Sequence, residues 1–127
     1  MATMQVELVS VERPIWSGEA TGVYARTVDG ELGILPHHAP LLGALEPGRI
    51  VRIEREGEDD LRVAVHGGFL SVGNDGVSVL AEMAETADEI DVARARAALD
   101  KADAGTPEGA AARDRSLARL RAAGESV

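Results

Sequence analysis

The sequence lacks cysteine altogether and contains only one Trp, one Tyr and one Phe. Without cysteine the chain cannot form disulfides, thiolate metal sites or cysteine nucleophiles, and its composition fits a reducing compartment such as the cytoplasm. With so few aromatic rings, the core must be filled by Val, Leu, Ile and Ala. Such a core favours thin β layers and close helix contacts over a roomy cofactor pocket.

Long apolar segments and an excess of positive charge are also lacking. No stretch approaches the roughly 20 apolar residues of a membrane helix, and residues 1–8 show neither the basic segment nor the apolar run of an export signal. The formal net charge of −9 would repel nucleic acid phosphates and anionic lipid headgroups. We therefore expect a soluble, unexported protein that binds no nucleic acid and meets a membrane only through a protein partner.

Short alternating segments dominate what the sequence does contain. Apolar and polar residues alternate at 4–8 and again at 61–65, and a pattern with period two turns one face of a strand inward. Turn-forming residues separate such segments, for example the pair Gly67-Gly68. The pattern runs from residue 4 to residue 81 and predicts an N-terminal flattened β-sandwich or barrel of about eight to ten short strands.

The composition changes near residues 84–89, where alanine and charged residues replace the strand formers. We therefore divide the chain into a β-sandwich domain at 1–87 and a helical region at 88–127. The apolar faces of the helical region are mostly alanine. Burial between its helices is then worth only a few kcal/mol at about 25 cal/mol per Å², so we expect this region to be marginally stable and able to move.

Capping signals mark two helices in that region. Asp91, or alternatively Asp88, is a good N-cap for a first helix, which we expect Gly105 to end. Thr106-Pro107-Glu108 is a restart signal, with an N-cap, a proline at the first helical position and an acid in the first turn, and it leads into a second helix that continues over 109–123. Because the link between the helices is short, the sequence predicts a C-terminal antiparallel two-helix hairpin.

Two segments resemble a known family. Residues 30–42, Gly-Glu-Leu-Gly-Ile-Leu-Pro-His-His-Ala-Pro-Leu-Leu, resemble the signature loop of the epsilon subunits of bacterial F-type ATP synthases. Residues 67–72 resemble a later glycine-containing strand of these subunits, and agreement at 15–18 and at Pro47-Gly48 extends the resemblance over essentially the whole chain.

This resemblance implies a structural and regulatory subunit rather than an enzyme. Such a subunit is a non-catalytic part of the rotor, in the central stalk, and links the gamma subunit to the ring of c subunits during proton-driven ATP synthesis. It touches the alpha and beta catalytic subunits only transiently. Its implied location is peripheral, on the cytoplasmic face of the cell membrane.

Contact residues follow from the same resemblance. The residues that match the family's c-ring contacts are Glu31 and His38. The alternative is that they are solvated side chains in a loop whose glycines and prolines shape a corner of the sandwich. The family also packs one sandwich face on gamma, which requires exposed apolar surface, and the sequence leaves both faces open.

A second candidate site lies in the helical region. Residues 90–95 resemble the Ile/Leu-Asp-x-x-Arg-Ala motif of epsilon subunits that bind ATP, and residues 115–120 supply the matching Arg-x-x-x-Arg-Leu. Guanidinium groups that converge from two helices suit phosphate oxygens. The matching candidate ATP-binding residues are Asp91, Arg94, Arg115 and Arg119.

ATP would act as a regulator here, since no cofactor is required. Its binding would stabilise the closed hairpin by mass action, so low ATP would favour extension toward the catalytic subunits and inhibition of ATP hydrolysis. The alternative is that Asp91 only caps the first helix and that the arginines only keep the alanine-rich hairpin soluble.

Two other functions fit the residues less well. A small metal-dependent β-barrel enzyme would use imidazoles and a carboxylate as ligands, with His37, His38, His66 and Glu82 as the candidates. Adjacent histidines would point to opposite faces of a strand, however, and no nucleophile and base motif accompanies them. We therefore expect no metal site and interpret His66 as a structural histidine at a strand end. A free-standing nucleotide-sensing module is the other alternative, which would lack a gamma partner.

Overall fold

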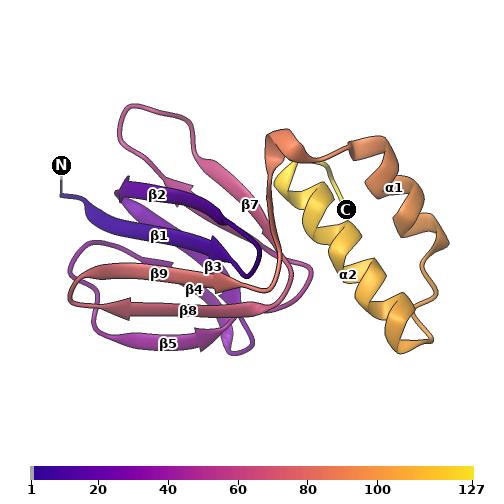
Figure 1. Ribbon diagram of the computed structural model, residues 1–127, viewed down its shortest axis with the longest axis horizontal. Coiled ribbons are helices and arrows are strands. Elements are labelled where there is room, and N and C mark those ends of the chain that lie inside the picture. The colour runs from indigo at the N-terminus through magenta and orange to yellow at the C-terminus, as the bar shows by residue number, and fades with distance from the viewer. Residues whose placement is uncertain (1) are drawn as a thin grey trace.

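Ten short strands form where the sequence alternates, and two helices follow them in the computed structural model, which describes residues 2–127 (Figure 1). The strands are β1 (Met4–Ser10), β2 (Pro14–Ala20), β3 (Gly22–Thr27), β4 (Gly30–Ile34), β5 (Leu41–Ala44), β6 (Ile50–Glu54), β7 (Leu61–Val65), β8 (Gly68–Gly73), β9 (Gly76–Ala81) and β10 (Ala84–Thr86). They form two five-stranded sheets, so the predicted β-sandwich is confirmed.

The two sheets have the strand orders β2-β1-β9-β8-β5 and β10-β7-β6-β3-β4. The pairing of β1 with β9 is parallel, and the other named pairs are antiparallel. Strands β4 and β5 are each the last strand of their sheet, and the loop over residues 35–40 joins them. The signature segment of residues 30–42 therefore lies along one edge of the sandwich, but only residues 35–40 form a loop, because its two ends belong to the edge strands β4 and β5.

The core between the sheets is aliphatic, as the scarcity of aromatic residues requires. Its largest side chains with no exposed surface include Leu8 of β1, Ile34 of β4, Ile53 of β6 and Leu70 of β8. Alternation accounts for this arrangement, because each strand turns every second residue toward the opposite sheet.

Gly68 allows two strands of the first sheet to pair closely. Its φ is +129°, and a Cβ atom placed on it would lie 2.1 Å from the carbonyl oxygen of Leu80. Both the dihedral angle and the space exclude a side chain. Steric exclusion of a side chain thus explains why the second residue of the pair Gly67-Gly68 is glycine.

The C-terminal region forms the predicted hairpin. A short 3-10 helix, η1 (Ala87–Glu89), leads from β10 into α1 (Val92–Lys101), and α2 (Pro107–Ala122) follows. The Asp91 carboxylate accepts a hydrogen bond from the backbone of Arg94, and the Thr106 side chain accepts one from Gly109. Both predicted N-caps are therefore confirmed.

The first helix ends earlier than the sequence suggested. It ends at Lys101 instead of reaching Gly105, and Ala102 is already extended. The Asp103 side chain accepts a hydrogen bond from the backbone of Gly105, a local turn that competes with the helix. The second helix begins at Pro107, as predicted from the N-cap Thr106 and the proline at the first helical position.

The hairpin docks on the sandwich through alanine. Ala118 and Ala122 of α2 pack against Ala64 of β7, with Ile50 and Ile90 at the margin of the cluster. Ala64 has no exposed surface. The end of β7 is therefore buried on both faces, by the opposite sheet on one side and by α2 on the other. Helix α1 packs on α2 and lies farther from the sheets (Figure 1). None of the helices described within residues 2–127 is long and apolar enough to cross a membrane.

Candidate functional site

A carboxylate at the junction of sandwich and hairpin holds two side chains. Oε1 of Glu85, on β10, accepts a hydrogen bond from Nε of Arg119 at 2.7 Å and lies 3.1 Å from Nε2 of His66. Glu85 and Arg119 side chains are 22% and 26% exposed, and the His66 side chain only 7%. The predicted structural histidine at a strand end is confirmed, with a partner that the sequence does not reveal.

Protonation at this junction follows from burial and charge. Burial lowers the pKa of His66, and the nearby guanidinium groups of Arg119 and Arg115 lower it further against the pull of Glu85. Burial alone would raise the pKa of Glu85, but hydrogen bonds from Arg119 and His66 outweigh it and hold that pKa below its usual range. At neutral pH the junction therefore pairs an ionised carboxylate with a neutral imidazole and a guanidinium.

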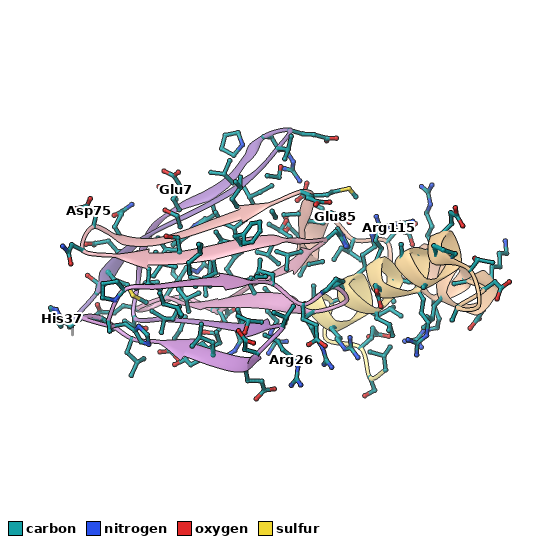
Figure 2. The ribbon with its side chains drawn as sticks, turned by 90° about the horizontal axis from the view of Figure 1, so that it is seen from below. Glu7, Arg26, His37, Asp75, Glu85 and Arg115 are labelled. Carbon is teal, nitrogen blue, oxygen red and sulfur yellow. The ribbon has the colours of Figure 1, made fainter. Side chains whose placement is uncertain are left out.

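A cleft of about 550 Å³ opens beside this junction, between α2 and the loops at the near end of the sandwich. Arg115 lines it together with Ala111 and Asp114 of α2, and with His66 and Glu82 of the sandwich. Figure 2 shows Arg115 and Glu85 close to the place where the helices meet the sheets.

The four candidate ATP-binding residues are only partly brought together. Arg115 and Arg119 lie one turn apart on α2, but Arg119 is already paired with Glu85. The carboxylate of Asp91 caps α1, and Arg94 is exposed on that helix. The predicted capping role of Asp91 is thus observed, and the role of the four residues in binding ATP stays a prediction.

The two candidate c-ring residues lie along the β4–β5 edge but do not touch each other. Glu31, near the start of β4, is 3.5 Å from Nη1 of Arg26 and its side chain is 82% exposed. His38 lies beyond the end of β4, beside a cleft of about 470 Å³ that Asn74 and Asp75 also line. Figure 2 shows the neighbouring His37 and Asp75 at the end of the sandwich that lies away from the hairpin.

Histidines and carboxylates do not gather into a metal centre. His37 and His38 are at the far end of the sandwich, whereas His66 and Glu82 line the cleft next to α2. No group of three or more His, Asp or Glu side chains within residues 2–127 is arranged to hold a metal ion. The ligand set of the metal-enzyme alternative is therefore divided between two ends of the molecule.

An apolar patch that the sequence did not locate lies on strands β5, β8 and β9, on the outer face of the first sheet. Leu42 is 70% exposed, Phe69 54% and Leu80 53%. Phe69 lies opposite Leu80 on the neighbouring strand and opposite Ala44 on the other side. The signal in the sequence is a pair of adjacent apolar residues in each strand, such as Phe69-Leu70, because alternation forces one of the two outward.

Arg13 holds the segment that leads into the hairpin. Nη2 of Arg13 donates to both carboxylate oxygens of Glu89 at 2.8 Å and also to the carbonyl of Ala84. The hydrogen bond from Arg13, with further ones from Thr86, lowers the pKa of Glu89 to about 2. Residues 84–89 are thus anchored to the β1–β2 turn before the hairpin begins.

Comparison with known proteins first defines the class. The family description "ATP synthase, Delta/Epsilon chain, beta-sandwich domain" matches residues 3–87. Those residues contain all ten strands of the two sheets described above. The sandwich is therefore that of the ATP synthase delta and epsilon chains.

Full-length relatives narrow this class. The chain is 55% identical over 124 residues to the ATP synthase epsilon chain of Mycobacterium avium (strain 104), and 53% identical over 124 residues to that of Mycobacterium tuberculosis (strain ATCC 25177 / H37Ra). Each match covers 98% of both chains. The chain therefore belongs to the ATP synthase epsilon chain family, and the resemblance noted in the sequence is confirmed.

Solved structures agree with this assignment. A chain of the Euglena gracilis mitochondrial ATP synthase, in an OSCP/F1/c-ring structure, matches with a TM-score of 0.73 and 26% identity over 97% of this chain and 82% of that one. A chain of the Tetrahymena thermophila central stalk and c-ring matches with a TM-score of 0.64 and 21% identity over 98% of both chains. The second likeness concerns the fold alone.

Proposed function

We propose that this chain is a non-catalytic rotor subunit that links the gamma subunit of ATP synthase to the ring of c subunits. In this role it performs no chemistry of its own and transmits torque during proton-driven ATP synthesis. The complex would hold it at the cytoplasmic face of the cell membrane, with transient contact to the alpha and beta subunits. The main support is the apolar patch of Leu42, Phe69 and Leu80, which a rotor subunit needs for a permanent partner.

We assign this patch to gamma. Three large side chains, each more than half exposed, lie on the adjacent strands β5, β8 and β9, and Phe69 and Leu80 are direct cross-strand neighbours. Burying them is worth several kcal/mol at about 25 cal/mol per Å². The outer face of the other sheet is partly covered by α2, so the patch is on the face that stays open while the hairpin is docked.

Co-expression with gamma tests this assignment. A chain with Phe69→Ser and Leu80→Ser should fail to co-purify with gamma, whereas Val28→Ser should not affect recovery. Val28 is 65% exposed in the β3–β4 turn and is thus an equally exposed apolar side chain outside the patch. Undiminished recovery of gamma with the double variant would rule out this face.

We place the c-ring contact along the β4–β5 edge, with Glu31 and His38 as its two ends. The two residues line different clefts, so we propose that the c ring contacts the whole edge between them. Since the chain has no native cysteine, Glu31→Cys and His38→Cys can each be cross-linked to c subunits in native membranes. Asp59→Cys, at the β6–β7 turn, is the control. Cross-linking at Asp59 but at neither edge residue would reject the placement.

We further propose that ATP regulates hydrolysis by holding the hairpin in its docked position. Arg115 supports this, because it faces the cleft and no carboxylate within residues 2–127 lies in ion-pair range of it. Phosphate would have to compete with Glu85 for Arg119. Calorimetric titration with ATP should show binding that Arg115→Ala weakens and Arg113→Ala, an exposed arginine of the same helix, does not. Equal ATP affinity of both variants would remove Arg115 from the site.

A further inference from the structure

A groove of about 530 Å³ lies on the outer face of β3, β4 and β6, where the last turn of α2 meets the sandwich. Four arginines line it, namely Arg26, Arg49, Arg52 and Arg121. The first three belong to the sandwich and the fourth to α2. This concentration of positive charge stands out in a chain whose formal net charge is −9.

The arginines of the sandwich are partly neutralised. Nη1 of Arg52 is 2.6 Å from a carboxylate oxygen of Asp60. One oxygen of Glu46 lies 2.6 Å from Nε of Arg26 and 3.4 Å from Nε of Arg49. The shared carboxylate therefore occupies the Nε edge of Arg26 and Arg49, and it leaves the Nη groups of Arg49 to other partners.

Arg121 differs from the other three. Its Nη1 donates to the carbonyl oxygen of Gly48, and among residues 2–127 no carboxylate lies within 4.0 Å of its guanidinium. Burial lowers the pKa of Arg121, and repulsion from Arg49 and Arg113 adds to this effect. A guanidinium carries five N–H donors, so Arg121 brings unused donors to the groove, and its nearest carboxylates, Glu46 and Asp114, act on it only from beyond ion-pair distance.

We propose that this groove binds a phosphate-sized oxyanion between Arg49 and Arg121. Oxygen atoms of one such ion accept hydrogen bonds from the Nη groups of both arginines and neutralise the repulsion between them. Neither arginine belongs to the candidate ATP site, which lies on the side of α2 that faces Glu85. The inference concerns the isolated chain and does not depend on the proposed rotor role.

The neighbourhood favours inorganic phosphate over a nucleotide. Among residues 2–127, Tyr24 is the one aromatic side chain that lines the groove, and its ring is already packed against neighbouring groups. The guanidinium carbon of Arg52 lies 4.2 Å from the ring centroid, while the backbone of Gly22 and Gly33 lies so close that a Cβ atom there would meet the ring at 2.9 and 3.3 Å. A base that stacked on the face of Tyr24 occupied by Arg52 would therefore have to displace that guanidinium.

Binding at this place would couple the ion to the hairpin. Arg49 is fixed in the sandwich and Arg121 is part of α2, so the complete site exists only while the hairpin is docked. By mass action, phosphate would then favour the docked state. The equilibrium between docked and undocked hairpin would shift further as the ratio of phosphate concentration to its dissociation constant rises.

The test is a titration of the full chain with sodium phosphate at constant ionic strength, with sodium chloride as the balancing salt. The Nε–Hε NMR signals of Arg49 and Arg121 should shift saturably with phosphate and remain unchanged in chloride. Arg49→Gln should weaken phosphate binding at least tenfold, and Arg121→Gln likewise. Glu31→Gln, which removes a carboxylate from the rim, should tighten it.

Controls separate this site from general charge effects. Arg55→Gln changes an arginine of the β6–β7 turn that contacts Glu58 and lies outside the groove, so phosphate affinity should be unchanged. Arg49→Gln is the decisive variant, because within residues 2–127 that side chain makes no hydrogen bond to α2 and its loss leaves the Arg121 contact with Gly48 in place. Shifts that do not saturate, or an Arg49→Gln chain that binds phosphate as tightly as the wild type, would overturn the proposal.

A comparison of ATP with tripolyphosphate tests the size of the ligand. Equal affinities of this groove for the two compounds support a site that recognises only phosphate oxygens. Tighter binding of ATP together with shifts of the Tyr24 ring signals would show that the base is recognised as well, and this would contradict the assignment to inorganic phosphate.

Discussion

Nε of Arg119 donates to Oε1 of Glu85 at 2.7 Å, and this hydrogen bond joins α2 to β10 across the boundary between hairpin and sandwich. Within residues 2–127, the only other side-chain hydrogen bond between α2 and the sandwich runs from Arg121 to the Gly48 carbonyl. The apolar part of the contact includes the alanine cluster around Ala64, with Ile50 and Ile90 at its margin. The docked position of the hairpin therefore depends on few interactions, and single substitutions should be able to shift it.

Loss of the Glu85 charge should loosen the hairpin without unfolding the sandwich. Glu85→Gln replaces a charge-assisted hydrogen bond between two largely buried side chains, and we expect docking to weaken by about 1–3 kcal/mol. Backbone amides of α2 should exchange with solvent faster by hydrogen-exchange measurement, while core strands such as β6 keep their protection. Glu108→Gln, an exposed acid in the first turn of α2, is the matched control. Unchanged exchange in Glu85→Gln would mean that the alanine contacts alone hold the hairpin.

Acidification should also release the hairpin, because protonation of His66 disfavours the docked state. The ring nitrogen Nδ1 is buried without a hydrogen-bond partner among the described residues, so a protonated ring would leave an N–H group unsatisfied. The charged groups around the ring are Glu85 of β10, Arg115, Arg119 and Asp114 of α2, and Glu12 and Glu82 of the neighbouring loops.

The sign follows from the lowered pKa of His66 in the docked state. The undocked ring has a pKa near the ordinary value of about 6.5, so the contribution of His66 to docking is fully present above that pH. It is lost as the pH falls from there through the lower pKa of the docked state. Glu85, whose pKa is also lowered, adds a second loss below the ordinary range of a carboxyl group.

A distance probe between α1 and the sandwich, measured from about pH 7.5 down to about pH 5, tests this dependence. The wild type should shift toward an undocked hairpin below about pH 6.5, whereas His66→Asn should respond only at lower pH, where Glu85 is protonated. Because the pKa of Glu89 is about 2, the pair of Arg13 and Glu89 stays intact throughout this range. A wild-type response identical to that of His66→Asn would refute the role of His66.

Local signals in the sequence predicted local structure well. Asp91 and Thr106 act within three residues of their own positions, so their capping roles can be read from spacing alone. The sandwich was predictable for a similar reason, since alternation reflects which face of a strand is buried. The end of α1 was missed because Asp103 forms a side-chain turn that competes with a helix.

Contacts between distant residues were not predictable in the same way. Alanine is common on both solvent-exposed and buried faces of strands, so nothing in the sequence of β7 alone indicated that α2 covers Ala64. The pairing of Glu85 with Arg119 joins residues 34 positions apart, and no pattern in one sequence specifies such partners. The apolar patch left a detectable trace, because Phe69-Leu70 is a pair of apolar neighbours in a strand that has only one buried face.

An enlarged side chain in the alanine cluster should force the hairpin away from the sheet. Ala118 has no exposed surface and faces Ala64, so Ala118→Leu overpacks the contact and should cost about 1–3 kcal/mol of docking. Ala97→Leu adds the same side chain at an exposed position of α1 and should be nearly neutral. The α2 amides, followed by hydrogen exchange, should lose protection only in the first variant. Equal protection in both would place the docking energy elsewhere.

Gly68 offers a test of the sandwich itself. An alanine there must adopt a φ of +129° and would place its Cβ atom 2.1 Å from the Leu80 carbonyl oxygen. Strain of this kind costs about 1–3 kcal/mol before the clash is relieved, so we expect Gly68→Ala to lower the free energy of unfolding by at least that amount. At Gly73, the other end of β8, a Cβ atom would have no neighbouring atom within 4 Å, and Gly73→Ala should leave stability within about 0.5 kcal/mol of the wild type. Urea unfolding of both variants checks the difference, and a Gly68→Ala chain as stable as Gly73→Ala would show that β8 and β9 can separate at no cost.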